Sequence, residues 1–154
     1  MLSYCHKLVY VLIILSSFLI SAQVFSKGDL SKQPPITVKV NLSNKDNALR
    51  FFPENIKFES GKLYRLVLKN AGTEKHYFSS DKFSQSIFTR KIQIVNNKGR
   101  ALVEVKGNIR EIEIYPGEIA EWWFVPIKTG VFDDLKCVIT GHAEAGMRGK
   151  ITVQ

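Results

Sequence analysis

The sequence predicts an all-β domain, a Greek-key sandwich or barrel of about seven to nine short strands with one short flanking helix. Short segments of alternating apolar and polar residues recur along the chain, as is typical of half-buried strands. Residues that favour turns, mainly Gly, Asn and Pro, separate these segments. The 154 residues are 45% apolar and 23% charged, which suits one globular domain with a core and is too short for two of ordinary size.

The first predicted strand covers residues 36–42, in which apolar and polar side chains alternate. Residues 49–58 are also rich in apolar side chains, but Pro53 cannot donate to a strand ladder, so an edge strand or a bend is expected there. Residues 63–68 are apolar on both faces. This two-sided pattern predicts a central strand.

A strand over residues 75–78 would place His76 near its beginning. We expect residues 79–90 to form the short helix, because Ser79 or Ser80 could cap it and apolar residues recur with helical spacing. The remaining predicted strands are 92–94, 101–105, 109–114, 121–125 and 150–153. The 121–125 segment carries two tryptophans and a phenylalanine, which we interpret as core rather than as a docking surface because large aromatic side chains are mostly buried.

The N-terminus has the order of residues that is typical of a secretory signal peptide. Lys7 precedes an apolar run over residues 8–20, and small residues follow. Cleavage after Ala22 or after Ser26 would fit, so residues 1–26 are interpreted as the signal peptide. The alternative is an uncleaved membrane anchor, because the stretch approaches the length that spans a bilayer.

This interpretation divides the chain into a signal peptide over residues 1–26, a linker over 27–34 and a globular domain over 35–154. It also predicts that the protein is periplasmic or otherwise exported. The formal net charge is +8, but the basic residues are dispersed rather than clustered. The sequence therefore argues against nucleic-acid binding.

Near the C-terminus, Cys137, His142 and Met147 have the spacing C-x4-H-x4-M, and a second histidine, His76, lies far upstream. In blue-copper sites two imidazoles and one thiolate bind the metal in a near-trigonal plane, with a weak thioether bond on the axis. These residue types therefore predict a site for one copper ion that alternates between Cu(I) and Cu(II). Each residue alone would be unremarkable; their joint arrangement favours the metal site.

The small number of cysteine, methionine and histidine residues in the chain supports the same four ligands. The chain has two cysteines, two methionines and three histidines, and one of each lies in the predicted leader. An exported protein normally pairs its cysteines, so a lone Cys137 needs another role, and metal ligation supplies one. Zinc is the competing metal, but Met147 argues against it. A two-copper electron-entry centre would need a second cysteine in the loop.

The chain resembles the cupredoxins, the blue-copper family that includes plastocyanin, azurin and sulfocyanin. The segments that carry the resemblance are Phe52-Pro53-x-x-Ile56-x-Phe58-x-x-Gly61, Leu66 to Asn70, Glu74 to Phe78 and the closing loop. The resemblance implies that His76, Cys137, His142 and Met147 are the metal ligands, with His142 the more exposed histidine. One position departs from the family: Tyr77 stands where many members have an Asn or Ser that braces the ligand loop.

The expected function is an exported, mononuclear type 1 copper protein that carries single electrons between redox partners. It would act as a monomer, dock its partners transiently near His142 beside an apolar patch of Ala143 and Ala145, and expose Glu144 at the rim. It would not be an enzyme, because no histidines remain for a second copper centre. The alternatives are a periplasmic copper-binding, resistance or metal-uptake protein and a redox subunit held at the membrane by an uncleaved N-terminus.

Overall fold

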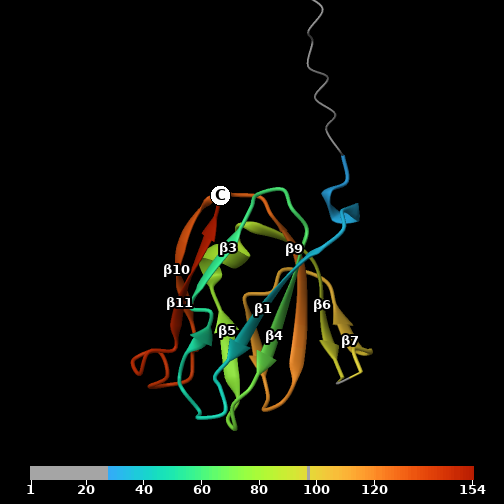
Figure 1. The fold of residues 1–154 in the computed structure, drawn as a ribbon. Helices are drawn as coiled ribbons and strands as arrows, with labels where there is room; N and C mark the ends of the chain where they lie inside the picture. The colour runs from blue at the N-terminus through green and yellow to red at the C-terminus, as the bar shows by residue number, and fades with distance from the viewer. Residues whose placement is uncertain (1–27, 97) are drawn as a thin grey trace, which may run out of the picture.

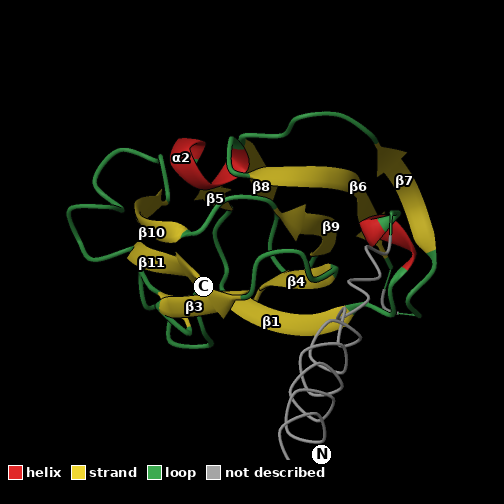
Figure 2. Ribbon diagram, turned by 90° about the horizontal axis from the view of Figure 1, so that it is seen from above, coloured by secondary structure: helices red, strands yellow, loops and turns green. Residues whose placement is uncertain are grey.

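Two β-sheets face each other across an aromatic core in the computed structural model, which describes residues 28–96 and 98–154 (Figures 1 and 2). The predicted signal peptide lies outside the described residues. One sheet has six strands in the order β2-β1-β4-β9-β6-β7, and the other has five in the order β3-β11-β10-β5-β8. The predicted all-β sandwich is confirmed.

The elements alternate with short turns along the chain. The strands are β1 (Ile36–Leu42), β2 (Phe51–Phe52), β3 (Asn55–Phe58), β4 (Tyr64–Asn70), β5 (His76–Ser79), β6 (Ile87–Val95), β7 (Ala101–Val105), β8 (Glu111–Ile114), β9 (Ile119–Pro126), β10 (Gly130–Lys136) and β11 (Arg148–Val153). The helical elements are η1 (Leu30–Lys32), a 3-10 turn within the predicted linker, and α2 (Asp81–Ser84).

Strand β4 is central, as its two apolar faces predict. It pairs with β1 in parallel and with β9 in antiparallel orientation. The predicted edge or bend at Pro53 is also confirmed. The chain passes there from β2, at the edge of the six-stranded sheet, to β3, at the edge of the five-stranded sheet, so that Pro53 interrupts no ladder.

The helix predicted over residues 79–90 is much shorter than expected. Ser80 caps α2, its hydroxyl accepting a hydrogen bond from the Phe83 amide at 3.3 Å. The helix ends at Ser84, and from Ile87 the chain pairs with β9 as strand β6. Pairing with β9 satisfies the backbone of residues 87–95 and buries alternate side chains, which one further helical turn on the flank would not do.

The prediction for the aromatic segment of β9 is correct for two of its three residues. Trp122 and Phe124 are buried, and the Trp122 indole donates a hydrogen bond to the Thr89 hydroxyl at 3.1 Å. Trp123 points to the other face of the sheet, where Arg65 and Lys91 lie over its ring at 5.8 and 5.1 Å from the centroid. Successive residues of a strand face opposite sides, so Trp123 cannot join the core that Trp122 occupies.

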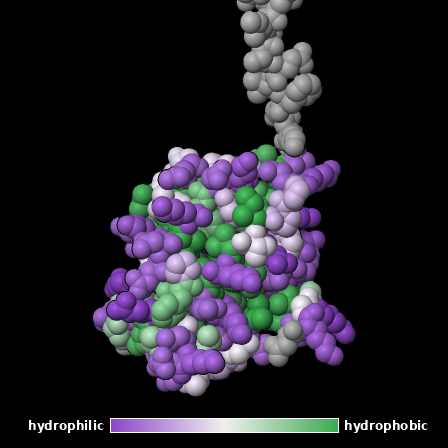
Figure 3. All heavy atoms as spheres, in the orientation of Figure 1, coloured by the Kyte–Doolittle hydropathy of each residue, from purple (hydrophilic) through white to green (hydrophobic). Residues whose placement is uncertain are grey.

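The face of the molecule seen in Figure 3 is mostly hydrophilic, with apolar areas between the hydrophilic residues. Within residues 28–96 and 98–154, no helix has the length and apolar character that crossing a bilayer requires. The loop between β10 and β11, coloured red in Figure 1, projects at the opposite end of the sandwich from the segment that leads into β1. This loop contains three of the four predicted ligand residues, Cys137, His142 and Met147, and His76 is the first residue of β5.

Candidate metal centre

The loop over residues 137–147 folds back on itself so that its two ends meet. The Cys137 amide donates to the Met147 carbonyl at 3.1 Å, and the Met147 amide donates to the His142 carbonyl at 2.9 Å. Gly141 and Gly146 have φ angles of 84° and 112°, a left-handed conformation that glycine adopts without strain. The tight loop therefore brings the backbones of Cys137, His142 and Met147 together.

His76 reaches the same place from the five-stranded sheet. It is the first residue of β5, which lies between β8 and β10, and Cys137 directly follows β10. The Tyr77 amide donates to the Cys137 sulfur at 3.4 Å. Sheet pairing thus connects the residue after the first histidine, Tyr77, with a cysteine 60 residues later in the chain.

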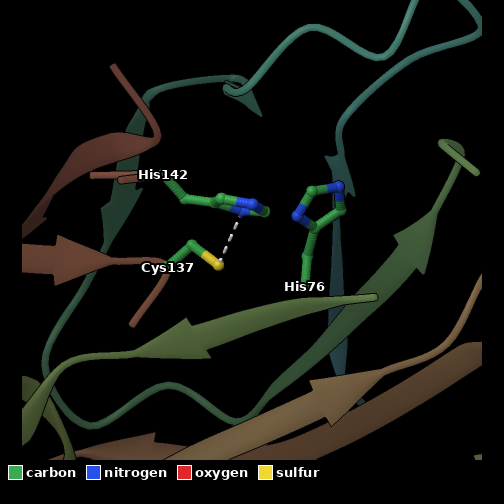
Figure 4. A group of neighbouring side chains, drawn as sticks. All are labelled: His76, Cys137 and His142. Atoms are coloured by element: carbon green, nitrogen blue, oxygen red, sulfur yellow. Dashed lines mark hydrogen bonds between the residues drawn. The ribbon is translucent and has the colours of Figure 1, made fainter. Parts of the chain in front are cut away.

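Figure 4 shows the His76 and His142 rings and the Cys137 sulfur around a common space. One ligand atom from each of the three residues lies within 4.8 Å of the other two, and the Cys137 sulfur is 3.5 Å from His142 Nδ1. Met147 is fully buried and is hydrogen-bonded through its backbone to both Cys137 and His142. All four predicted residues therefore belong to one locus, and their assignment as ligands stays a prediction.

The side chains at this locus have the chemistry of metal ligands. His76 Nδ1 is buried without a hydrogen-bond partner, a costly arrangement unless another group satisfies the nitrogen. Burial, and then the neighbouring His142 ring, lower the pKa of His76, which keeps the imidazole in the neutral form that binds metals. Two imidazoles, a thiolate and a thioether form the donor set that suits copper.

The departure at Tyr77 is compensated by the main chain. The hydrogen bond to the Cys137 sulfur comes from the Tyr77 amide, which any residue at this position except proline could supply. The Tyr77 side chain instead lies beside Glu113 on β8, whose carboxylate raises the pKa of the phenol. The link between β5 and the ligand loop therefore does not require the Asn or Ser that many family members have.

The two histidines differ in exposure. The His142 side chain is 13% exposed, whereas His76 as a residue is 2% exposed. Glu144 is exposed at the rim, as predicted. The predicted apolar patch is wrong in one residue: Ala143 is buried, and its carbonyl accepts a hydrogen bond from Arg148 Nε at 2.9 Å. Val138, 42% exposed, provides apolar surface on the same loop.

Sequence reasoning did not identify Asn70 as part of this region. Asn70 is fully buried, and its amide group donates to the carbonyls of Glu74 and Ile114 at 2.7 and 2.8 Å. Its side-chain oxygen accepts from the Gly72 amide at 3.0 Å. These bonds hold the turn that leads into His76. An asparagine directly before an Ala-Gly turn was the available signal.

Glu74 was also missed as a neighbour of the site. Its carboxylate Oε2 lies 3.9 Å from His142 Nε2, whereas the other ring nitrogen, Nδ1, is the one 3.5 Å from the Cys137 sulfur. Glu74 precedes His76 by two positions but contacts the other histidine. Nothing in the local sequence relates Glu74 to a residue 68 positions later, because the packing of β5 against the loop creates the contact.

Comparisons with known proteins agree with this centre. No protein-family model matches the chain. The copper-resistant cuproprotein CopI of Rubrivivax gelatinosus is 32% identical over 131 residues, which cover 82% of this chain and 71% of CopI.

Solved structures share the fold at low sequence identity. The dithionite-reduced auracyanin of Roseiflexus castenholzii has a TM-score of 0.53 and 16% identity, over 79% of this chain and 99% of that chain. Auracyanin A, a blue copper protein of Chloroflexus aurantiacus, has a TM-score of 0.50 and 16% identity, over 79% and 100%. The copper-containing nitrite reductase of Thermus scotoductus has a TM-score of 0.56 and 18% identity, over 81% of this chain and 32% of that chain.

Proposed function

The chain belongs to the cupredoxin family of blue-copper proteins and is a relative of the cuproprotein CopI, and we propose that it carries single electrons between redox partners rather than catalysing a reaction. The observation that carries this proposal is a donor set held in place by the protein. The ligand loop is closed by its own hydrogen bonds, and His76 is fixed by strand pairing.

Copper, when bound, supplies the one-electron couple. His76, Cys137 and Met147 are buried, so these residues exclude water and hold their donors in one arrangement. Such rigidity suits electron transfer, because little of the protein must move when the charge of the site changes. His142 is the more exposed of the two histidines, and we propose that partners dock against its outer edge.

The first experiment is an absorption spectrum of the purified exported protein after addition of Cu(II). We expect an intense visible band from charge transfer between thiolate and copper, and its loss in Cys137→Ala. Cyclic voltammetry should then show a reversible one-electron couple. A colourless complex, or a coloured one without a reversible couple, would argue against an electron carrier.

Copper resistance is the second candidate, and the observation that favours it is the identity with CopI, which is described as copper-resistant. A single buried site of this kind could also sequester copper. The test is expression of the chain and of Cys137→Ala in a copper-sensitive bacterium. Rescue of growth at raised copper by the wild-type chain alone supports this role, and equal growth of both strains opposes it.

We further propose that the protein is exported and that residues 1–26 are removed. The order of a basic residue, an apolar run and small residues supports this proposal. Mass spectrometry of the exported protein should give a chain that starts at Gln23 or Lys27. A mass that includes the whole apolar run would instead support a membrane-anchored redox subunit.

A further inference from the structure

We propose that Glu74 is a positioning residue for the metal centre, holding the His142 ring with its proton on Nε2 and its Nδ1 lone pair toward Cys137. The inference rests on the proposed copper site. It adds a residue on the outer side of the exposed imidazole that neither the motif nor the comparisons identify.

The first argument is the orientation of the ring. His142 Nδ1 is 3.5 Å from the Cys137 sulfur, so this nitrogen lies beside the space between the three side chains of Figure 4, and Nε2 is the second nitrogen of the same ring. Glu74 Oε2 is 3.9 Å from Nε2. That separation is longer than a direct hydrogen bond, so the carboxylate acts through its charge or through a bridging water. A negative charge beside Nε2 favours the tautomer that carries its proton there.

The second argument is that the protein holds Glu74 in position. Its carbonyl accepts the buried Asn70 amide at 2.7 Å. The preceding residue, Thr73, donates to Asn47 Oδ1 through its amide at 2.8 Å and through its hydroxyl at 3.0 Å. The backbone of Glu74 is thus held by hydrogen bonds to two other segments of the chain. Only the side-chain dihedral angles of Glu74 remain free to vary the position of its carboxylate.

The third argument is chemical. Histidines that bind metals usually donate their second ring N–H to a carboxylate, a carbonyl or a water, which fixes the ring and makes it a stronger ligand. A carboxylate near the site also stabilises the higher charge of Cu(II) more than that of Cu(I). Removing the charge at position 74 should therefore raise the reduction potential.

The chain offers a matched control for this substitution. Glu144 is 72% exposed in its side chain, and Glu74 is 71% exposed. Glu144 lies two residues after His142, but its carboxylate faces Arg148 at 3.9 Å instead of an imidazole. Glu74→Gln and Glu144→Gln each remove one exposed negative charge near the loop, and only Glu74→Gln removes it from beside the ring.

The test has a metal-free part and a copper part. In the metal-free protein, ¹⁵N NMR of the imidazoles should show His142 with its proton on Nε2. Glu74→Gln should raise the fraction protonated on Nδ1 severalfold, and Glu144→Gln should leave it unchanged. In the copper protein, Glu74→Gln should weaken Cu(II) binding relative to Cu(I) by about threefold to tenfold, as expected for a unit charge acting near a protein surface. The control should change this ratio by less than twofold.

Equal responses of the two variants, or an unchanged tautomer in Glu74→Gln, would overturn the inference. Failure of the proposed function would look different. The wild-type protein would then lack a thiolate-to-copper band or a reversible couple, whereas the tautomer measurement needs no metal and would still report on Glu74.

Discussion

Replacement of Asn70 by alanine tests whether the turn before His76 is held as the structure indicates. The substitution removes two hydrogen bonds to main-chain carbonyls, of Glu74 and Ile114, and one from the Gly72 amide. Asn70 is fully buried, so water cannot readily replace the lost partners. The perturbation therefore leaves polar groups unsatisfied near the candidate metal centre.

The expected loss of stability follows from these three bonds. A typical intramolecular hydrogen bond contributes about 1 kcal/mol, and a buried partner left unpaired costs at least as much. We expect Asn70→Ala to lower the free energy of unfolding by about 3 kcal/mol. For a domain of this size, that corresponds to a fall in Tm of roughly 10 °C.

The assay is urea denaturation of the metal-free protein, followed by tryptophan fluorescence, with thermal unfolding as a second measurement. Asn41→Ala is the matched control, because Asn41 lies on β1 and is exposed. Its replacement should change the free energy of unfolding by less than about 0.5 kcal/mol. If the two variants differ by less than about 1 kcal/mol, the hydrogen bonds of Asn70 do not hold the turn and the reasoning fails.

Three further predictions concern the metal and strand β11. Met147→Leu should keep copper bound but raise the reduction potential, because a thioether would be the weakest of the four donors; loss of binding would contradict this. Copper should raise the Tm of the wild-type protein by several degrees and that of Cys137→Ala little, as calorimetry can check. Gly149→Ala should destabilise by more than about 2 kcal/mol in urea denaturation, since its Cβ would lie 2.7 Å from the Glu54 carbonyl, whereas Gly28→Ala meets nothing within 4 Å.

The sequence alone predicted the features that depend on neighbouring residues. Alternating side chains identified most strands, and Pro53 predicted an edge strand or a bend at the position where the chain passes from one sheet to the other. The spacing of Cys137, His142 and Met147 predicted one closed loop. These predictions worked because strand periodicity, turn chemistry and short loops are local, so the information needed lies within about ten residues.

Only the tertiary structure decided what depends on register and packing. Whether residues 87–90 continue α2 or begin β6 was settled by pairing with β9, which local propensity cannot report. The same holds for Trp123, whose place outside the core follows from the face of β9 on which it falls. The contacts of Glu74 and Asn70 join segments far apart in the chain. Their positions depend on which strands pair, and the local patterns of a single sequence do not predict that pairing.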